Sequence, residues 1–70
     1  MDITAYKVKA LLYPQEEYLL GSPVPIIDEG AFYRIDGTHI FDKFRIQSME
    51  CKDSGILLHM PEKDVLLIVE

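Results

Sequence analysis

Residues 55 to 70, "GILLHMPEKDVLLIVE", contain two aliphatic runs with only a short, mostly polar stretch between them. The runs are Ile56-Leu57-Leu58 and Val65-Leu66-Leu67-Ile68-Val69, and Pro61-Glu62-Lys63-Asp64 lies between them. The second run is too short to cross a membrane, and its β-branched residues favour a strand over a helix. We therefore expect two strands joined by a turn, of which the second is buried on both faces or covered on one face by another chain.

The length limits the fold to one domain, residues 1–70, and a domain of this size buries only about 60% of the surface that its unfolded chain exposes. The single cysteine, Cys51, cannot form a disulfide within the chain, and no CxxC or paired Cys/His spacing predicts zinc. Small cores usually need additional support. We therefore expect a protein partner, either a second copy in a homo-oligomer or a larger protein.

The composition, with 49% hydrophobic and 27% charged residues, is that of a folded globular protein. Its formal net charge of −5 argues against binding to nucleic-acid phosphates, which depends on clustered Lys and Arg. The first residues lack the basic and apolar regions of a signal peptide, and no apolar run approaches the ~18 residues of a membrane span. We expect a cytoplasmic protein with no membrane segment, where one reduced thiol is ordinary.

The opening residues alternate between apolar and polar types, which favours a strand over residues 2–13. In that strand one face would carry Thr4, Tyr6, Val8, Ala10 and Leu12. A helix is the alternative, because a second set of residues shares a helical face: Ile3, Tyr6, Ala10 and Tyr13.

Residues 14–25 predict a long loop that contains prolines. Pro14 suits a first helical position, the acids after it suit a helix N-terminus, and Gly21 suits a helix end, so one or two helical turns are expected over 15–20. Pro23 and Pro25 withhold backbone donors and predict an extended segment outside the middle of a sheet. A long excursion in a small domain is a common place for binding.

The remaining residues predict short strands separated by turns. Ala31 to Ile35 and Thr38 to Phe41 flank Asp36-Gly37, a pair that suits a two-residue type I′ hairpin. Asp42-Lys43 predicts a bulge or break, because continued alternation would bury the carboxylate of Asp42.

A further strand is expected from Phe44 to Cys51, with Phe44 and Ile46 facing inward, followed by a turn at Asp53-Ser54-Gly55. The fold class is then mostly β, with five to six short strands and one short helical turn. We expect a small antiparallel barrel or strongly bent sheet of SH3-like or OB-like type.

No residue pattern predicts catalysis, a cofactor or a metal. His39 lies three residues from Asp36 and from Asp42, and residues three apart on a strand point to opposite faces. His59 and Cys51 have no partner group in sequence that would activate them. Phosphate-binding glycine motifs and the GxSxG motif are absent from the chain.

Aromatic and acidic residues give the stronger functional prediction. The chain has more large aromatic side chains than one small core can enclose, and tyrosines concentrate at interfaces. An apolar trio lies among acids and prolines in the predicted loop: Tyr18, Leu19 and Leu20. The predicted partner-binding residues are Glu16, Glu17, Tyr18, Leu19, Leu20, Asp28, Glu29 and Tyr33.

The predicted function is a small, acidic, noncatalytic protein-interaction module that acts as a homo-oligomer or as an accessory subunit or regulator of a larger protein. The alternative is an inhibitor of the phage or mobile-element type, whose carboxylates replace DNA phosphates. Its acids would be Glu16, Glu17, Asp28, Glu29 and Asp36. A nucleic-acid-binding barrel would need its bases to converge beside aromatic side chains, and the net acidity argues against it.

Overall fold

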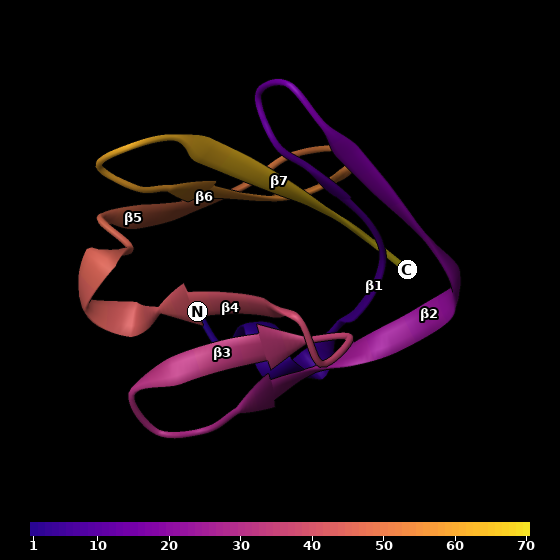
Figure 1. Ribbon diagram of the computed structural model, residues 1–70, viewed down its shortest axis with the longest axis horizontal. Helices are drawn as coiled ribbons and strands as arrows, with labels where there is room; N and C mark the ends of the chain where they lie inside the picture. Colours follow the sequence, from indigo (N-terminus) through magenta and orange to yellow (C-terminus); the bar gives the residue numbers. More distant parts are fainter.

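Seven antiparallel strands form one sheet in the computed structural model, which describes residues 1–70, and two 3-10 turns complete the fold (Figure 1). The strand order is β4-β3-β2-β1-β7-β6-β5. The strands are β1 (Lys7–Leu12), β2 (Glu17–Asp28), β3 (Phe32–Ile35), β4 (His39–Asp42), β5 (Ser48–Cys51), β6 (Gly55–His59) and β7 (Asp64–Val69). The 3-10 turns are η1 (Ile3–Ala5) and η2 (Lys43–Arg45).

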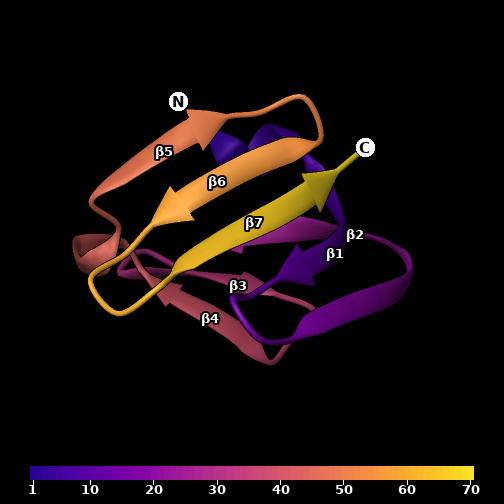
Figure 2. The ribbon, with the colours of Figure 1, turned by 90° about the horizontal axis from the view of Figure 1, so that it is seen from above.

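The two aliphatic runs at the end of the sequence form β6 and β7, as predicted, and β7 lies between β6 and β1 (Figure 2). Val65 and Leu67 are fully buried, whereas Leu66 and Ile68 are half-buried on the other face of β7. One face of this strand therefore belongs to the core, and the other is the outer surface of the sheet. The expectation of burial on both faces within the chain is wrong.

The core lies between the β3–β4 ladder and the β5–β6–β7 ladder, which face each other across the molecule in Figure 1. Every strand except β5 contributes a buried hydrophobic residue, and no polar or charged residue is buried. The buried cluster consists of Ile3, Val8, Leu11, Ile26, Ile35, Phe41, Ile56, Leu58, Val65 and Leu67.

The sheet is open, neither closed nor strongly curled, so the expected barrel is not formed. Strands β4 and β5 are its two edges. The chain passes from one edge to the other through η2, and no hydrogen-bonded ladder joins β4 to β5. The prediction of a mostly β antiparallel fold is confirmed, with seven strands instead of five to six.

The predicted loop over 14–25 and its helix over 15–20 are wrong, because β2 begins at Glu17 and runs for 12 residues. The helical signals in this segment are local and weak, since Glu16 and Glu17 at a helix N-terminus would each contribute only about 0.3–1 kcal/mol. Pairing with β1 outweighs them, since it satisfies a row of backbone groups at once. Pro23 is tolerated because the β1–β2 ladder is interrupted between Leu19 and Val24. Pro25 lies opposite Lys7 in that ladder, and β2 is an inner strand, so the expectation of a segment outside the middle of the sheet is wrong.

Strand β1 confirms the strand prediction for Lys7–Leu12, but its alternation is broken. Both ladders of β1 shift register between Val8 and Ala10, and Lys9 is an extra residue in the ladder with β7, because Val8 and Ala10 pair with the adjacent Val69 and Ile68. Val8 and Leu11 consequently face the core, while Ala10 and Leu12 face outward. The predicted single face carrying Val8, Ala10 and Leu12 is therefore wrong.

The turn predictions between β3 and β5 are largely confirmed. Asp36 and Gly37 both have positive φ, 54° and 74°, although three residues separate the paired Ile35 and His39 where two were expected. The chain breaks at Asp42, whose carboxylate accepts a hydrogen bond from the backbone N–H of Phe44. Phe44 is 89% exposed, so its predicted inward orientation is wrong.

Neighbouring leucines on β7 should differ sharply in their contribution to stability. Leu67→Ala removes a fully buried side chain and should lower the free energy of unfolding by about 2–5 kcal/mol. Leu66→Ala truncates a half-buried side chain and should lower it by about 1 kcal/mol. Urea denaturation of both variants measures the difference, with the volume-conserving Leu67→Met as a folded control. Equal losses would contradict the assignment of the faces.

Gly55 begins β6 where the backbone of β7 is closest. A Cβ built at Gly55 would overlap the carbonyl oxygen of Leu67 and lie 3.1 Å from the Cα of Ile68. Gly55→Ala should therefore lower the free energy of unfolding by about 1–3 kcal/mol through overpacking. Gly21→Ala is the matched control, because no atom lies within 4 Å of a Cβ at that position. Thermal unfolding of the pair tests the contact, and equal melting temperatures would refute it.

Candidate protein-binding surfaces

The outer surface of the central strands carries aliphatic side chains in two cross-strand rows. Residues paired directly across antiparallel strands share a face, so the pairing registers define the rows. The first row runs Glu17, Leu12, Leu66, Leu57, Glu50, and the second runs Leu19, Ala10, Ile68, Gly55. We name Leu12, Leu19, Leu57, Leu66 and Ile68 the outer leucine face.

Exposure along the outer leucine face is graded. Leu19 is 76% exposed, and the four other members are half-buried by their neighbours on the sheet. Acidic residues end the first row at both sides, Glu17 on β2 and Glu50 on β5. The result is an apolar centre with a charged rim on a sheet face that no element of this chain covers.

The rim of the outer leucine face includes a charged network around His59. Its Nε2 lies 2.8 Å from Oε1 of Glu50, and its Nδ1 lies 3.2 Å from Oδ1 of Asp64. These carboxylates raise the pKa of His59, the hydrogen bond to Glu50 being the largest cause. Lys52 binds the same Glu50 at 2.7 Å and, with His59, lowers the pKa of that carboxyl.

A second surface is formed by four rings at one end of the core. We name Tyr13, Tyr18, His39 and Phe41 the aromatic cluster. Tyr13 stands edge-on to Tyr18 with ring centroids 5.4 Å apart, and Tyr18 stands edge-on to His39 at 4.6 Å. The Tyr13 hydroxyl is hydrogen-bonded to Nδ1 of His39 at 2.9 Å, so the β1–β2 turn is tied to β4. Burial raises the pKa of Tyr13.

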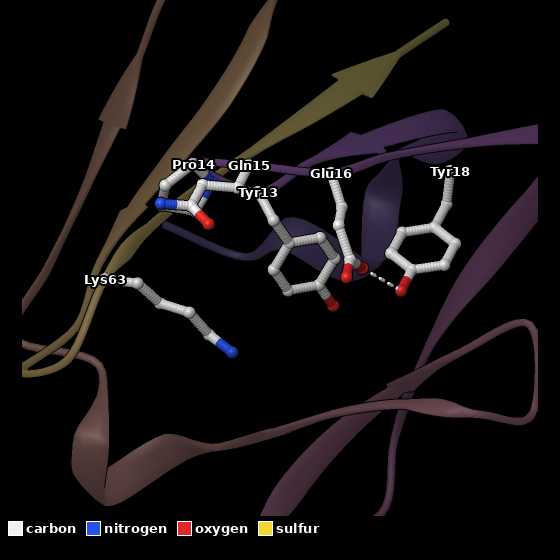
Figure 3. A pocket seen from close by; sticks show the side chains of 6 residues that line it. All are labelled: Tyr13, Pro14, Gln15, Glu16, Tyr18 and Lys63. Carbon is white, nitrogen blue, oxygen red and sulfur yellow. Dashed lines mark hydrogen bonds between the residues drawn. The ribbon is translucent and has the colours of Figure 1, made fainter.

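Two hollows flank Tyr18. The first, about 470 Å³, lies between the β1–β2 turn and Lys63, whose Nζ is 4.9 Å from the centroid of the Tyr13 ring (Figure 3). Glu16 enters this hollow and accepts a hydrogen bond from the Tyr18 hydroxyl, which raises the pKa of Tyr18.

The second hollow lies between the start of β2 and the β3–β4 turn, and its volume is about 580 Å³. We name it the β2–β4 hollow. It is lined by Glu17, Tyr18, Leu19, Leu20, Asp36, Thr38 and His39.

The structure divides the predicted partner-binding residues between the two ends of β2. Glu16, Glu17, Tyr18, Leu19 and Leu20 come together around the two hollows, although Leu20 also packs against the core. The remaining predicted residues are at the other end: Asp28, Glu29 and Tyr33.

At that far end the acids are already paired. Asp28 binds Lys43 at 2.7 Å, and Glu29 binds Arg34 at 2.7 Å. Lys43 also lies 4.8 Å from the Tyr33 ring centroid. The charges of this group are therefore paired with one another. The five acids named for the DNA-mimic hypothesis are divided between the two ends of β2, which gives that hypothesis no support.

The site includes residues that no sequence signal identified. Lys63 and His39 reach the aromatic cluster from turns and strands distant in sequence. Leu57, Leu66 and Ile68 were visible as apolar strand residues, but their orientation depends on register. Four basic residues of the nucleic-acid hypothesis are already paired with carboxylates: Arg34 with Glu29, Lys43 with Asp28, Arg45 with Glu62 and Lys52 with Glu50.

Three further findings concern metal ligands, membrane helices and similarity to known proteins. No group of three or more His, Cys, Asp or Glu side chains is placed to hold a metal ion. No helix of the structure has the length and apolar character needed to cross a membrane. No family model matches the chain, and neither a curated protein nor a solved structure matches it.

The His59 network should make stability depend on pH. Because the folded-state pKa of His59 is raised, its contribution is complete below the unfolded pKa of about 6.5 and is lost as pH rises through the folded value. Thermal melts from about pH 6 to about pH 9 should show the wild type losing more stability than His59→Gln. Parallel pH profiles would contradict the network.

Proposed function

We propose that this chain is a noncatalytic protein-interaction module that acts as a homo-oligomer or as an accessory subunit or regulator of a larger protein. The observation that supports the proposal is the outer leucine face. Five large aliphatic side chains project from paired positions of β1, β2, β6 and β7 on the side away from the core. Contiguous apolar patches of this kind on a small protein mark interaction sites.

The arrangement of this surface favours a protein partner. Protein interfaces have an apolar centre and a polar rim, which is the pattern of the row from Glu17 through Leu66 to Glu50. The outer side of a sheet can be covered by another sheet at a spacing of about 10 Å. The partner would then cover the half-buried residues of the outer leucine face, which lie on the side of the sheet away from the core.

A second copy of the chain meets these requirements. A two-fold axis parallel to β7 would bring Leu66 against its own counterpart and Leu12 against Leu57, because these residues are symmetric about Leu66 in the first row. The same axis would place Glu17 opposite Glu50, whose carboxylate is already bound by Lys52 and His59. Apolar groups would meet in the centre, and the charged residues would lie at the rim.

Assembly should depend on Leu66, at the centre of the outer leucine face, and not on exposed apolar residues elsewhere on the protein. Leu66→Asp places a charge in the centre of the outer leucine face and should shift the protein to monomer, since a buried unpaired charge is strongly unfavourable. Sedimentation velocity across a wide dilution series measures the shift. Ile40→Asp is the matched control, because Ile40 is 49% exposed on β4, outside the face, and should leave assembly unchanged.

Circular dichroism of both variants is the control that tests whether they are folded. If the wild type is monomeric at every concentration, affinity capture from cell lysate with wild type and Leu66→Asp tests the accessory-subunit form of the proposal. A monomeric wild type whose captured proteins are unchanged by Leu66→Asp would overturn it.

A further inference from the structure

The β2–β4 hollow has the charge and shape of a binding site for a cationic side chain. Glu17 and Asp36 both line it, the first from β2 and the second from the β3–β4 turn. Both residues are exposed, and neither makes an ion pair within the chain. No Lys or Arg lines the hollow. Its volume of about 580 Å³ lies in the ordinary range of ligand pockets.

The nearest arginine of the chain is already engaged. Arg34 donates to the carbonyl oxygen of Gly37 at 2.9 Å and to Oε1 of Glu29 at 2.7 Å. Its guanidinium is therefore bound to Glu29 and to the turn backbone, and it makes no ion pair with Asp36. The chain leaves its two acids in the hollow unpaired while it pairs Asp28 and Glu29 elsewhere.

The other walls of the hollow suit the carbon part of a long basic side chain. Leu19 and Leu20 supply apolar surface from opposite faces of β2, and Tyr18, 40% exposed, supplies an aromatic ring. Long basic side chains lay their methylene groups on apolar surface and keep the charged end among polar groups. An aromatic ring adds attraction for the cation.

We propose that the β2–β4 hollow binds an arginine side chain of a protein partner. The guanidinium lies between the carboxylates of Glu17 and Asp36, and its stem lies along Leu19 and the Tyr18 ring. Arginine fits better than lysine, because its planar and weakly hydrated guanidinium stacks on aromatic rings and binds carboxylates through two parallel hydrogen bonds. This site rests on the proposed function, since both concern binding to a protein partner, but the β2–β4 hollow does not include Leu66.

The test is a titration of isotope-labelled protein with N-acetylarginine N-methylamide, followed by two-dimensional NMR of the backbone amides. Saturable shifts are expected at residues 17–20 and 36–39, with the ligand raised to about 50 mM because one side chain binds in the millimolar range. The citrulline analogue has the same shape without the charge and should cause no saturable shift. The lysine analogue should bind several-fold more weakly.

Asp36→Asn and Leu66→Asp separate this site from the outer leucine face, whereas Glu17 lines the hollow and also ends the first row of that face. Glu17→Gln and Asp36→Asn should each weaken binding roughly tenfold, since each removes a charge-assisted hydrogen bond. Asn is suitable at position 36 because it tolerates the positive φ of that residue. Leu66→Asp should bind the arginine analogue as the wild type does, whatever its oligomeric state.

Three results would overturn the proposal. The first is the absence of saturable shifts, and the second is equal binding of the arginine and citrulline or lysine analogues. The third is wild-type affinity in both carboxylate variants. Assembly through Leu66 is measured separately by sedimentation, so failure of either proposal is distinguishable from failure of the other.

Discussion

Hydrogen bonding of β7 on both of its sides is the constraint on which the fold depends. Its ladder with β1 joins the first strand of the sequence to the last, and its ladder with β6 attaches the β5–β6 hairpin. The fully buried Val65 and Leu67 are supplied by the same strand, so pairing and core packing are specified together. Since the core of so small a chain contains only ten buried hydrophobic residues, every one of these contacts matters.

The sequence predicted the elements whose signals are local. The positive φ at Asp36 and Gly37, the break at Asp42 and the aliphatic strands at the end of the chain all follow from neighbouring residues. The sequence-based prediction failed where pairing between strands distant in sequence determines the structure. The strand β2 replaces a predicted loop because β1 pairs with it. The extra residue at Lys9, which reverses the faces of β1, is visible only in the register with β7.

For the candidate surfaces, too, the sequence identified residues by their local composition but not which of them lie together. Glu16 to Leu20 were identified from their composition, and the structure brings them together at two hollows. Asp28, Glu29 and Tyr33 had the same composition, yet they form a separate group with Lys43 and Arg34. Leu19 connects the two surfaces, because it belongs to the second row of the outer leucine face and also lines the β2–β4 hollow. A partner seated on one surface therefore lies beside the other.

The extra residue in β1 also bears on how the length of this chain can vary. Along a strand, loss of one residue turns all that follow to the opposite face. At Lys9, β1 contains one residue more than β7 has opposite it, so Val8 and Ala10 occupy successive positions of the β7 register. Removal of Lys9 would leave Val8 and Leu11 in the core and Ala10 outside. Position 9 is thus the place in β1 where related sequences can be one residue shorter while the core-facing and outward-facing side chains keep their faces.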